Sequence, residues 1–313
     1  MKGEVLGYCV LSAVVLIWVL SGFFIQFLFT ESGYDHPAAM TVFSVGLCAL
    51  LLLIPQKHEP APTKVLLLER PVTSKTVVKQ RVVLGLAWLS GQLLYNVSLK
   101  HMSVSSNTAV SSASSLFTFL FSLALLPGYA VTLPAVLALL CSSMGIFLIA
   151  SLDDGGLTAS PGGVLLAVAG CACYGFFTTM LKRFSRNDEE ESVITLFGHL
   201  GLVTCIVGPF VVLVADRSGV DPFALPSSVR PVFGMLTNAL IGSVLSDVLL
   251  AKTVLLLNPI TVSLGLSFTM PVSLLIDSAV GAKPFHLTYL AAMALQFTSV
   301  GLISYDNHVN NRV

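Results

Sequence analysis

Two acidic residues, Asp247 and Asp277, stand inside stretches of the chain that are otherwise almost wholly apolar. A charged residue at the centre of a membrane helix costs roughly 2.5–3.5 kcal/mol on insertion scales, so an acid kept there usually has a function. Two interpretations remain open. Either acid binds a solute or couples its movement to protons, or it lies near a helix end and reaches interfacial water. Asp247 is the stronger candidate for a functional acid.

The positions of these acids argue against the chemistry of an intramembrane aspartyl protease. Such an enzyme needs two carboxyl groups within about 6 Å that share one proton. Asp247 and Asp277 fall on adjacent predicted helices near opposite membrane faces, roughly 20 Å apart by helix rise. The chain also has no HExxH motif, no phosphate-binding glycine loop and no plausible Cys–His pair. We therefore expect that the protein is not an enzyme and uses no cofactor.

The six cysteines all fall inside predicted helices, where a metal site is not expected. Cys171 and Cys173 are two residues apart and so point to different faces of a helix. Without a nearby histidine or cysteine partner, they are better interpreted as buried packing thiols.

A run of serine and threonine residues that begins at Ser103 predicts a polar helix face. Its hydroxyl groups recur at spacings of three and four, which places on one side of a helix Thr108, Ser111, Ser115, Thr118 and Ser122. Such a row lines a polar cavity, or lets two helices approach closely because small residues favour packing in lipid, or does both. Ser112, in the same run, is a further candidate for contact with a solute.

Near the second acid, a proline interrupts a helical pattern that carries hydroxyl groups. Pro271 has no amide hydrogen, so the carbonyl of Ser267 loses its usual helical partner. Such a break exposes backbone carbonyls to a solute or acts as a hinge, or it is a simple kink that a neighbouring hydroxyl compensates. We expect Ser267 and Thr269 to contact the solute and Pro271 to be the hinge.

Further polar or aromatic residues lie inside the apolar stretches. Trp18 is unusual among them, because tryptophan normally anchors a helix at the membrane interface and Trp18 lies mid-helix. The group comprises Trp18, Ser21, Gln26, Gln92, Tyr95, Asn96, Tyr174, Asn238 and Gln296. The members expected at a solute site are Trp18, Ser21, Tyr95, Asn96 and Tyr174. Their rings would stack on a ring in the solute.

The elements that must position these residues are ten apolar stretches, which take up most of the 313 residues. Their approximate ranges are 6–29, 37–55, 82–99, 103–127, 131–151, 162–181, 192–215, 231–251, 254–280 and 285–305. A hydrocarbon core of about 30 Å needs about 20 helical residues. Each stretch must close its own backbone hydrogen bonds, because lipid offers none. With 55% hydrophobic and 10% charged residues, the composition agrees with an all-α membrane protein.

The basic residues predict the orientation of the ten helices. With the amino terminus in the cytosol, the cytosolic set is Lys2, Lys57, Lys64, Arg70, Lys75, Lys79, Arg81, Lys182, Arg183, Arg186, Lys252 and Arg312. The opposite set is only Lys100, Arg217, Arg230 and Lys283. Basic connections stay cytosolic during insertion, so both termini are expected there. This asymmetry leaves open whether the protein is in the plasma membrane or an endomembrane. The formal net charge of zero gives no reason to expect nucleic-acid binding.

The order of the helices predicts an internal repeat. A very tight hairpin at residues 100–102, and another at 252–253, each lead into a helix rich in hydroxyl groups. Without gaps, residues 103–122 align with 258–277, a shift close to half the chain length. Five crossings per half is an odd number, so the two halves would lie upside down to each other, as in many secondary transporters. We expect two inverted five-helix repeats, residues 1–157 and 158–313.

Several stretches together resemble the F branch of solute carrier family 35, within the EamA-like drug/metabolite transporter superfamily. They run in order along the chain at 17–21, 103–118, 180–183, 197–201, 240–247 and 264–273, followed by Asp277. At Asp247 the resembling subgroup more often carries glutamate, so the carboxylate is kept with a shorter reach. The resemblance implies ten helices in two inverted repeats around a central cavity that opens alternately to either side. It also implies a thiamine-like, nucleoside-like or nucleotide-sugar solute.

The sequence therefore predicts a secondary active transporter of a small polar organic solute, embedded in the lipid bilayer as a monomer or homodimer. The expected solute-binding residues are Trp18, Ser21, Tyr95, Asn96, Thr108, Ser111, Ser112, Ser115, Tyr174, Asp247, Ser267 and Thr269. Asp247 and Asp277 are the expected coupling residues. The alternative is a non-transporting membrane receptor or scaffold, which the short connections disfavour. A channel is a third possibility, disfavoured because the sequence has no evident charged filter.

Overall fold

The computed structural model describes residues 2–31, 34–54, 74–101, 104–111, 113–152, 161–185, 193–226, 229–257, 259–279 and 287–310. Within these ranges all regular secondary structure is helical, which confirms the predicted all-α class. The first elements are α1 (Lys2–Glu31), α2 (Pro37–Gly46), the 3-10 helix η1 (Leu47–Leu53), α3 (Ser74–Ser98), α4 (Val104–Ser111), α5 (Ser114–Leu125) and α6 (Leu133–Leu152). They are followed by α7 (Pro161–Ser185), α8 (Val193–Arg217), α9 (Val229–Thr237), the π-helix η2 (Asn238–Leu245), α10 (Ser246–Leu256), α11 (Pro259–Leu266), α12 (Thr269–Ala279) and α13 (Leu287–Asn310).

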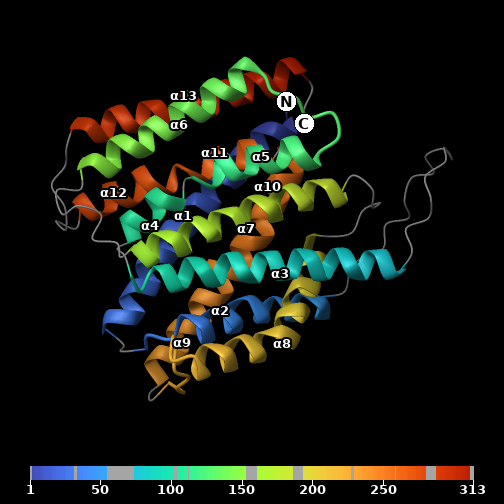
Figure 1. Ribbon diagram of the computed structural model, residues 1–313, viewed down its shortest axis with the longest axis vertical. Helices are drawn as coiled ribbons and strands as arrows, with labels where there is room; N and C mark the ends of the chain where they lie inside the picture. The colour runs from blue at the N-terminus through green and yellow to red at the C-terminus, as the bar shows by residue number, and fades with distance from the viewer. Residues whose placement is uncertain are drawn as a thin grey trace.

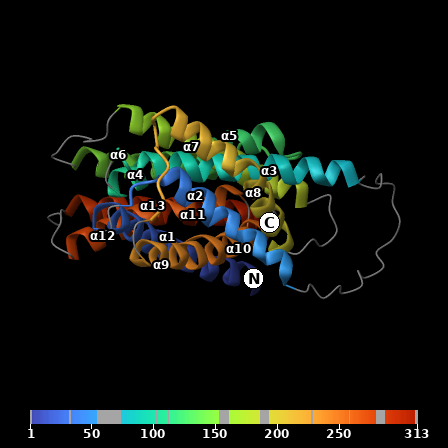
Figure 2. The same cartoon turned by 90° about the horizontal axis from the view of Figure 1, so that it is seen from below.

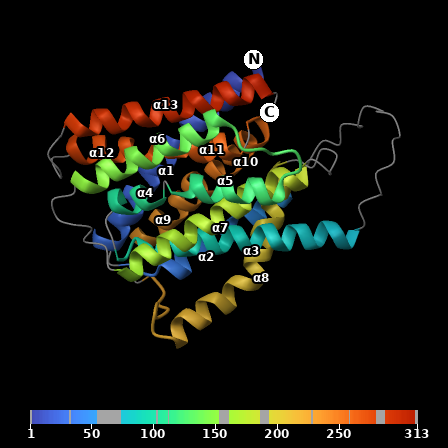
Figure 3. The same ribbon diagram turned by 45° about the horizontal axis from the view of Figure 1, so that its top comes forward.

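The helices lie side by side in one bundle (Figure 1). Helices α6 and α13 pack together along one flank, and α2, α8 and α9 occupy the opposite flank, with the remaining helices between them. The start of α1 and the end of α13 lie close together at one end of the bundle (Figure 1 and Figure 3). We call this the terminal end, and the opposite end, where α1 leads to α2, the far end. The view from below in Figure 2 shows α1 beside α9 and α10.

Five of the described helical stretches are both long and apolar enough to cross a membrane. They are Gly3–Phe29, Pro161–Phe184, Val193–Arg217, Val229–Leu256 and Pro259–Ile276. Shorter apolar helices cover Pro37–Leu53, Ser114–Leu125, Leu133–Gly145 and Leu290–Ile303. The multi-pass architecture follows from these helices, whereas the full count of ten crossings stays a prediction.

Large apolar side chains face outward on the described helices. On α8, Ile206, Phe210 and Val214 are each more than 60% exposed, and on α1 Leu16 and Leu20 are more than half exposed. An apolar surface of this extent is unusual on a soluble protein and marks contact with another apolar phase. In a bundle of apolar helices that phase is lipid.

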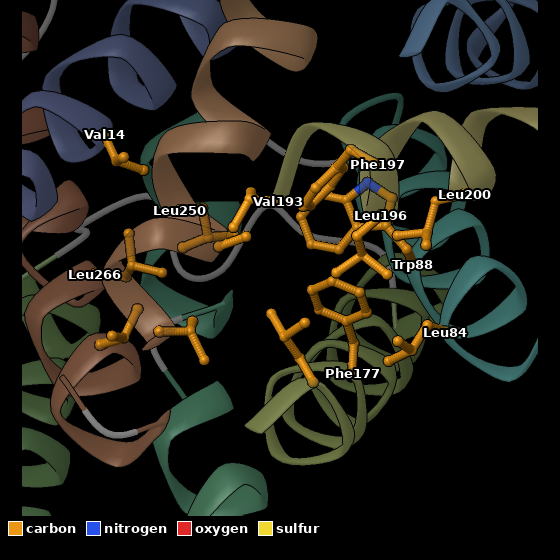
Figure 4. Packing of buried hydrophobic residues seen from close by; sticks show 14 of the residues in the cluster. Val14, Leu84, Trp88, Phe177, Val193, Leu196, Phe197, Leu200, Leu250 and Leu266 are labelled. Carbon is orange, nitrogen blue, oxygen red and sulfur yellow. The ribbon is translucent and has the colours of Figure 1, made fainter. Parts of the chain in front are cut away.

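The largest buried cluster lies toward the terminal end and joins helices from both halves of the chain. Leu11 and Val14 of α1 belong to it, as do Leu250 and Val254 of α10. Its aromatic centre places the ring of Phe177 4.6 Å from that of Trp88, with Phe197 5.9 Å from Trp88 on the other side. Figure 4 shows these three rings beside one another. The cluster closes the interior of the bundle at its terminal end.

The far end of the bundle is fastened by polar contacts. Asp221, which is almost fully buried in the α8–α9 connection, accepts a hydrogen bond of 2.7 Å from the amide of Ala38 in the first turn of α2. Its other carboxylate oxygen lies 3.1 Å from Nδ1 of His36. A carboxylate at a helix amino terminus satisfies free amides and the helix dipole. The contact therefore ties the α1–α2 connection to the second half of the chain.

Glycines allow several helices to cross closely. At Gly91 of α3 and Gly170 of α7, a β-carbon added to either glycine would lie 3.5–3.7 Å from the other helix's backbone or a β-carbon. At Gly175 of α7, an added β-carbon would lie 2.8 Å from the amide nitrogen of Thr118 in α5. Small residues at such crossings are the usual basis of helix packing in lipid. They fix which faces of α3, α5 and α7 meet.

Lys182 of α7 stabilises the end of α10. Its Nζ donates hydrogen bonds of 3.1 and 3.0 Å to the carbonyl oxygens of Leu255 and Leu257, groups left open where α10 ends. We expect Lys182→Met to lower the free energy of unfolding by about 1.5–3 kcal/mol, the range for a hydrogen bond from a charged donor. Thermal unfolding of the detergent-solubilised protein measures this. Lys252→Met is the matched control, since Lys252 is exposed one turn before the same helix end. Equal losses from both variants would contradict the capping role.

Candidate functional site

A cavity of about 140 Å³ lies inside the bundle. Its wall comes from α1, α2, α3, α4, α5, α7, η2, α11 and α12, whereas α6 and α13 contribute none of its described lining residues. The α1 residues in the wall begin at Trp18, past the middle of that helix, so the cavity is displaced toward the far end. A polar space of this size holds several water molecules or part of an organic solute.

Aromatic rings form one side of the cavity. Tyr174 of α7 packs edge-on against Trp18 with ring centres 6.1 Å apart, and lies 6.3 Å from Trp88 of α3. Tyr95, two turns after Trp88 on the same helix, also lines the space. The Oη atom of Tyr174 is buried and has no hydrogen-bond partner among the described residues. A buried polar atom left without a partner marks a place for water or a ligand group.

Carboxamide and hydroxyl groups form the rest of the wall. Nδ2 of Asn96 donates to Oγ1 of Thr41 over 2.8 Å, and Oγ of Ser21 donates to Oδ1 of Asn238 over 2.6 Å. Each carboxamide keeps donor or acceptor capacity beyond these bonds. The side chain of Gln92, which also lines the cavity, makes no hydrogen bond to the described residues. The wall can therefore donate to a solute and accept from it.

Asp247 lies just behind the aromatic wall. Its side chain is completely buried, and Nε1 of Trp88 donates to its Oδ2 over 3.2 Å. In parallel, Nε1 of Trp18 donates to Oγ of the preceding residue, Ser246, over 3.0 Å. Both indole groups thus end on consecutive residues, where the π-helix η2 gives way to α10. π-Helical segments inside longer helices are frequent at functional sites.

The interpretation that Asp247 reaches interfacial water is wrong. Helix α10 continues to Leu256, nine residues beyond Asp247, or about 13 Å by helix rise. The predicted span ended earlier because hydropathy falls at Lys252 and Thr253, although both residues are helical. A carboxyl group held at this depth has no water to solvate it and depends on Trp88 and Ser246 for hydrogen bonds.

The row of hydroxyl groups serves both cavity and packing, through different members. Thr108 and Ser111 of α4 line the cavity. Thr108 also pairs with Ser273 of α12 at 3.2 Å, and Thr118 of α5 pairs with Ser263 of α11 at 2.7 Å. The two broken helices are thus joined by hydroxyl pairs on either side of their breaks.

The structure brings most of the predicted solute-binding residues to one cavity. Those in its wall are Trp18, Ser21, Tyr95, Asn96, Thr108, Ser111, Tyr174 and Thr269. Ser115, Asp247 and Ser267 are buried and are not among the lining residues. Ser112 and the side chain of Asp277 lie outside the described part of the chain. The binding roles themselves stay predictions.

The break near Pro271 differs in detail from the expectation. The carbonyl of Ser267 is not left open, because it accepts a bond of 3.3 Å from the amide of Met270. The turn between α11 and α12 is thus closed by shorter-range bonds, as in a 3-10 turn. The role of Pro271 as a hinge stays a prediction.

Trp88, Thr41, Gln92 and Asn238 belong to the wall but not to the predicted set. Trp88 carries the same signal as Trp18, a tryptophan well inside a predicted span rather than at its interface. Gln92 and Asn238 stand out as amides in apolar stretches. Thr41 has no distinguishing signal in the sequence, since a single threonine near a helix start is common.

Comparison with known proteins places the chain among transporters. Residues 5–151 match the EamA-like transporter family. The first half of the chain is an EamA-like domain. The whole chain also resembles the F branch of solute carrier family 35, as expected from its motifs.

Full-length relatives are found in yeast. The chain is 27% identical to an uncharacterized vacuolar membrane protein of Saccharomyces cerevisiae, over all of this chain and 94% of that protein. It is 26% identical to the thiamine-repressible mitochondrial transport protein of the same organism, over 96% of this chain and 92% of the relative. Solute carrier family 35 member F5 of Mus musculus is 26% identical over 77% of this chain, which spans 46% of that longer protein.

A solved crystal structure shares the fold. It superposes with a TM-score of 0.67 over 96% of each chain at 16% identity. Together with the apolar helices, these relatives show that the chain is an integral, multi-pass membrane protein related to transporters.

Proposed function

We propose that the protein is a secondary active transporter that moves a small polar organic solute by alternating access. The observation that carries this proposal is the cavity, whose wall of rings, carboxamides and hydroxyls comes from helices of both halves of the chain. A concave site with a few placed polar groups is the usual form of a small-molecule site. No enzymatic step and no cofactor are part of the proposal.

The proposed architecture is ten transmembrane helices in two inverted repeats, residues 1–157 and 158–313. Helix ends recur at a constant shift, which supports it. Val229 begins α9 155 residues after Ser74 begins α3, and Leu287 begins α13 154 residues after Leu133 begins α6. The breaks recur as well. Helices α4 and α11 end at Ser111 and Leu266, and α5 and α12 begin at Ser114 and Thr269, both 155 residues apart.

The hydroxyl pairs between the broken helices support the same symmetry. A shift of 155 carries Thr108 onto Ser263 and Thr118 onto Ser273. The bond from Thr108 to Ser273 and the bond from Thr118 to Ser263 are therefore exchanged by the repeat. The helix packing behaves alike, since α1 against α10 corresponds to α7 against α3. Repeats related in this way place the solute site at their interface.

Alternating access needs a barrier on each side of the site. The buried cluster around Trp88 and Phe177 is the barrier toward the terminal end. A smaller cluster that includes Leu28, Leu99 and Val104 lies toward the far end, beside the contact of Asp221 with α2. In the proposed cycle one barrier opens while the other closes, with α4–α5 and α11–α12 bending at their breaks and Pro271 as a hinge.

Asp247 is the proposed coupling residue, and Asp277 is a second candidate. A buried carboxyl group that gains and loses a proton changes its hydrogen bonding to Trp88, which is itself part of the cavity wall. Occupancy of the cavity and the charge of the acid are thereby linked through one side chain. Intramembrane acids of transporters commonly act in this way.

Uptake into proteoliposomes tests the function. Purified protein is reconstituted and offered vitamins, nucleosides and nucleotide sugars, with and without a pH gradient. We expect saturable uptake of at least one solute, and counterflow when the vesicles are preloaded. Folded protein that accumulates none of them would favour the alternative, a membrane receptor or scaffold. Flux that does not saturate and shows no counterflow would favour a channel.

A further inference from the structure

The cavity wall differs from what a phosphorylated solute needs. We infer that the protein selects an uncharged, ring-bearing solute with hydroxyl or amide groups and rejects phosphorylated and cationic ones. The inference rests on the proposed function and narrows its solute class. It follows from three properties of the wall: its lack of formal charge, its closed helix turns, and the partners that its free polar atoms require.

No formally charged side chain lines the cavity among the described residues. The wall contains no lysine, arginine, histidine, aspartate or glutamate there. Phosphate groups in proteins are bound by arginine or lysine, or by free amides at a helix amino terminus. In a site shielded from water, the charge of a phosphate would be left without compensation, which is costly. A nucleotide sugar therefore fits this wall poorly.

The helix breaks at the cavity do not supply free amides in place of basic side chains. The amide of Met270 donates to the carbonyl of Ser267, and that of Val272 donates to Phe268. At the other break the amide of Leu116 donates to Ala113. These turns are therefore closed by their own backbone bonds, and the anion site that open helix ends provide is missing at these amides.

A cationic solute is disfavoured by the placement of Asp247. The nearest acid to the aromatic wall is this residue, yet it is fully buried and is not among the lining residues. Its Oδ2 already accepts the indole N–H of Trp88, which separates it from the cavity. A cation in the cavity would contact rings but no carboxylate. Ring contact alone is worth about 0.5–2 kcal/mol, well below the cost of desolvating a charge.

The groups that the wall does offer match a neutral heterocycle. Trp18, Tyr95 and Tyr174 present ring faces or edges, and Gln92 presents a carboxamide without a partner among the described residues. The unpartnered Oη of Tyr174 adds a further donor. A flat ring that carries carbonyl, amino or hydroxyl groups satisfies both the rings and the polar atoms. Nucleosides and pyridoxine are solutes of this kind.

The two tryptophans of the chain provide a direct measurement. Both Trp18 and Trp88 line the cavity, so intrinsic tryptophan fluorescence reports on this site alone. We would titrate the purified full chain with uridine, guanosine and pyridoxine, with the 5′-phosphate of each, with UDP-glucose, and with cationic thiamine. Trp18→Phe and Trp88→Phe show which indole responds, and displacement of a bound neutral solute removes the effect of ligand absorbance.

We expect saturable binding of at least one neutral solute, with its phosphate at least about tenfold weaker, a difference of one decade in Kd. Tighter binding of any phosphate, of UDP-glucose or of thiamine than of the neutral members would overturn the inference and leave the proposed function standing. Silence across the whole panel, in protein shown to be folded, would count against the cavity as a solute site and so against both.

A gain-of-function variant provides an independent test. Gln92→Lys places an ammonium group in the wall at a position whose side chain has no hydrogen bond to lose among the described residues. We expect it to strengthen binding of the phosphates by at least about tenfold while weakening that of the neutral solutes. Gln92→Met, which lacks the charge, is the matched control. If the phosphates gain nothing in a folded Gln92→Lys protein, the absence of basic residues is not what excludes them.

Discussion

Replacing Asp247 by asparagine is expected to lower solute uptake by at least about tenfold while the yield of folded protein stays within about twofold of wild type. Asparagine has nearly the same shape, and its carbonyl oxygen can still accept the indole N–H of Trp88, so the packing behind the cavity wall is kept. What is lost is the ability to gain and lose a proton. Uptake into proteoliposomes, normalised to protein that elutes as a single species, measures the effect.

Asp306→Asn is the control for this experiment. Asp306 is also buried, at 1% exposure, but it belongs to α13, which contributes no described residue to the cavity wall. We expect its replacement to leave uptake per folded molecule unchanged. Should Asp247→Asn reduce yield and uptake in equal proportion, Asp247 has a structural role only, and the coupling role assigned to it is wrong.

Gly201→Ala is expected to destabilise the protein by about 1–3 kcal/mol or more, because overpacking a closely packed site forces the backbone to move. A β-carbon on Gly201 of α8 would collide with the backbone of Cys48 and Ala49 in η1, and neither is the end of a flexible side chain. Helices α2 and α8 would have to separate along the flank that they form. The expected result is a lower apparent melting temperature and a smaller fraction of monodisperse protein.

The chain contains its own control for this change. Gly301 of α13 has no atom within 4 Å of the position that a β-carbon would take. There Gly301→Ala should be neutral or stabilising by up to about 1 kcal/mol, since alanine favours a helix more than glycine does. If both variants lose stability equally, close approach at Gly201 is not the cause.

The two changes test different parts of the proposal. Gly201 fixes how closely one pair of helices packs and is remote from the polar wall, so its effect is on the amount of folded protein. Asp247 leaves the packing in place and removes a chemical property. A transporter in which both predictions hold has a rigid flank of glycine-packed helices and a separate acid that responds to the contents of its cavity.

Much of the fold could be predicted from the sequence because its causes are local. In lipid each apolar stretch must satisfy its own backbone, so the run from residue 6 to 29 becomes α1 whatever its neighbours are. The break before Pro271 follows equally locally, from a missing amide hydrogen. Helix ends were less predictable. Helix α3 begins at Ser74, before the apolar stretch, because Lys75 and Lys79 favour helix although they do not enter lipid.

The site could be predicted only in part. Trp18, Tyr95 and Asn96 are conspicuous in the sequence because such groups are rare inside apolar stretches. Ser115 carries the same signal as Ser111, yet only Ser111 lines the cavity. Helical spacing shows which residues share a face, but not where on that face the neighbouring helix ends and the cavity begins.

The sequence by itself determined that the chain forms apolar helices, that two hydroxyl-rich helices recur at a shift of 155, and that an acid is kept within one of the spans. Only the tertiary structure decided that Trp88 covers this acid, that Trp18 reaches Ser246 beside it, and that the wall of the cavity carries no formal charge among the described residues. The physical reason is that helix formation in lipid depends on each segment alone. The rotation and spacing of one helix against another depend instead on close contacts such as Gly91 with Gly170, between residues far apart in the chain.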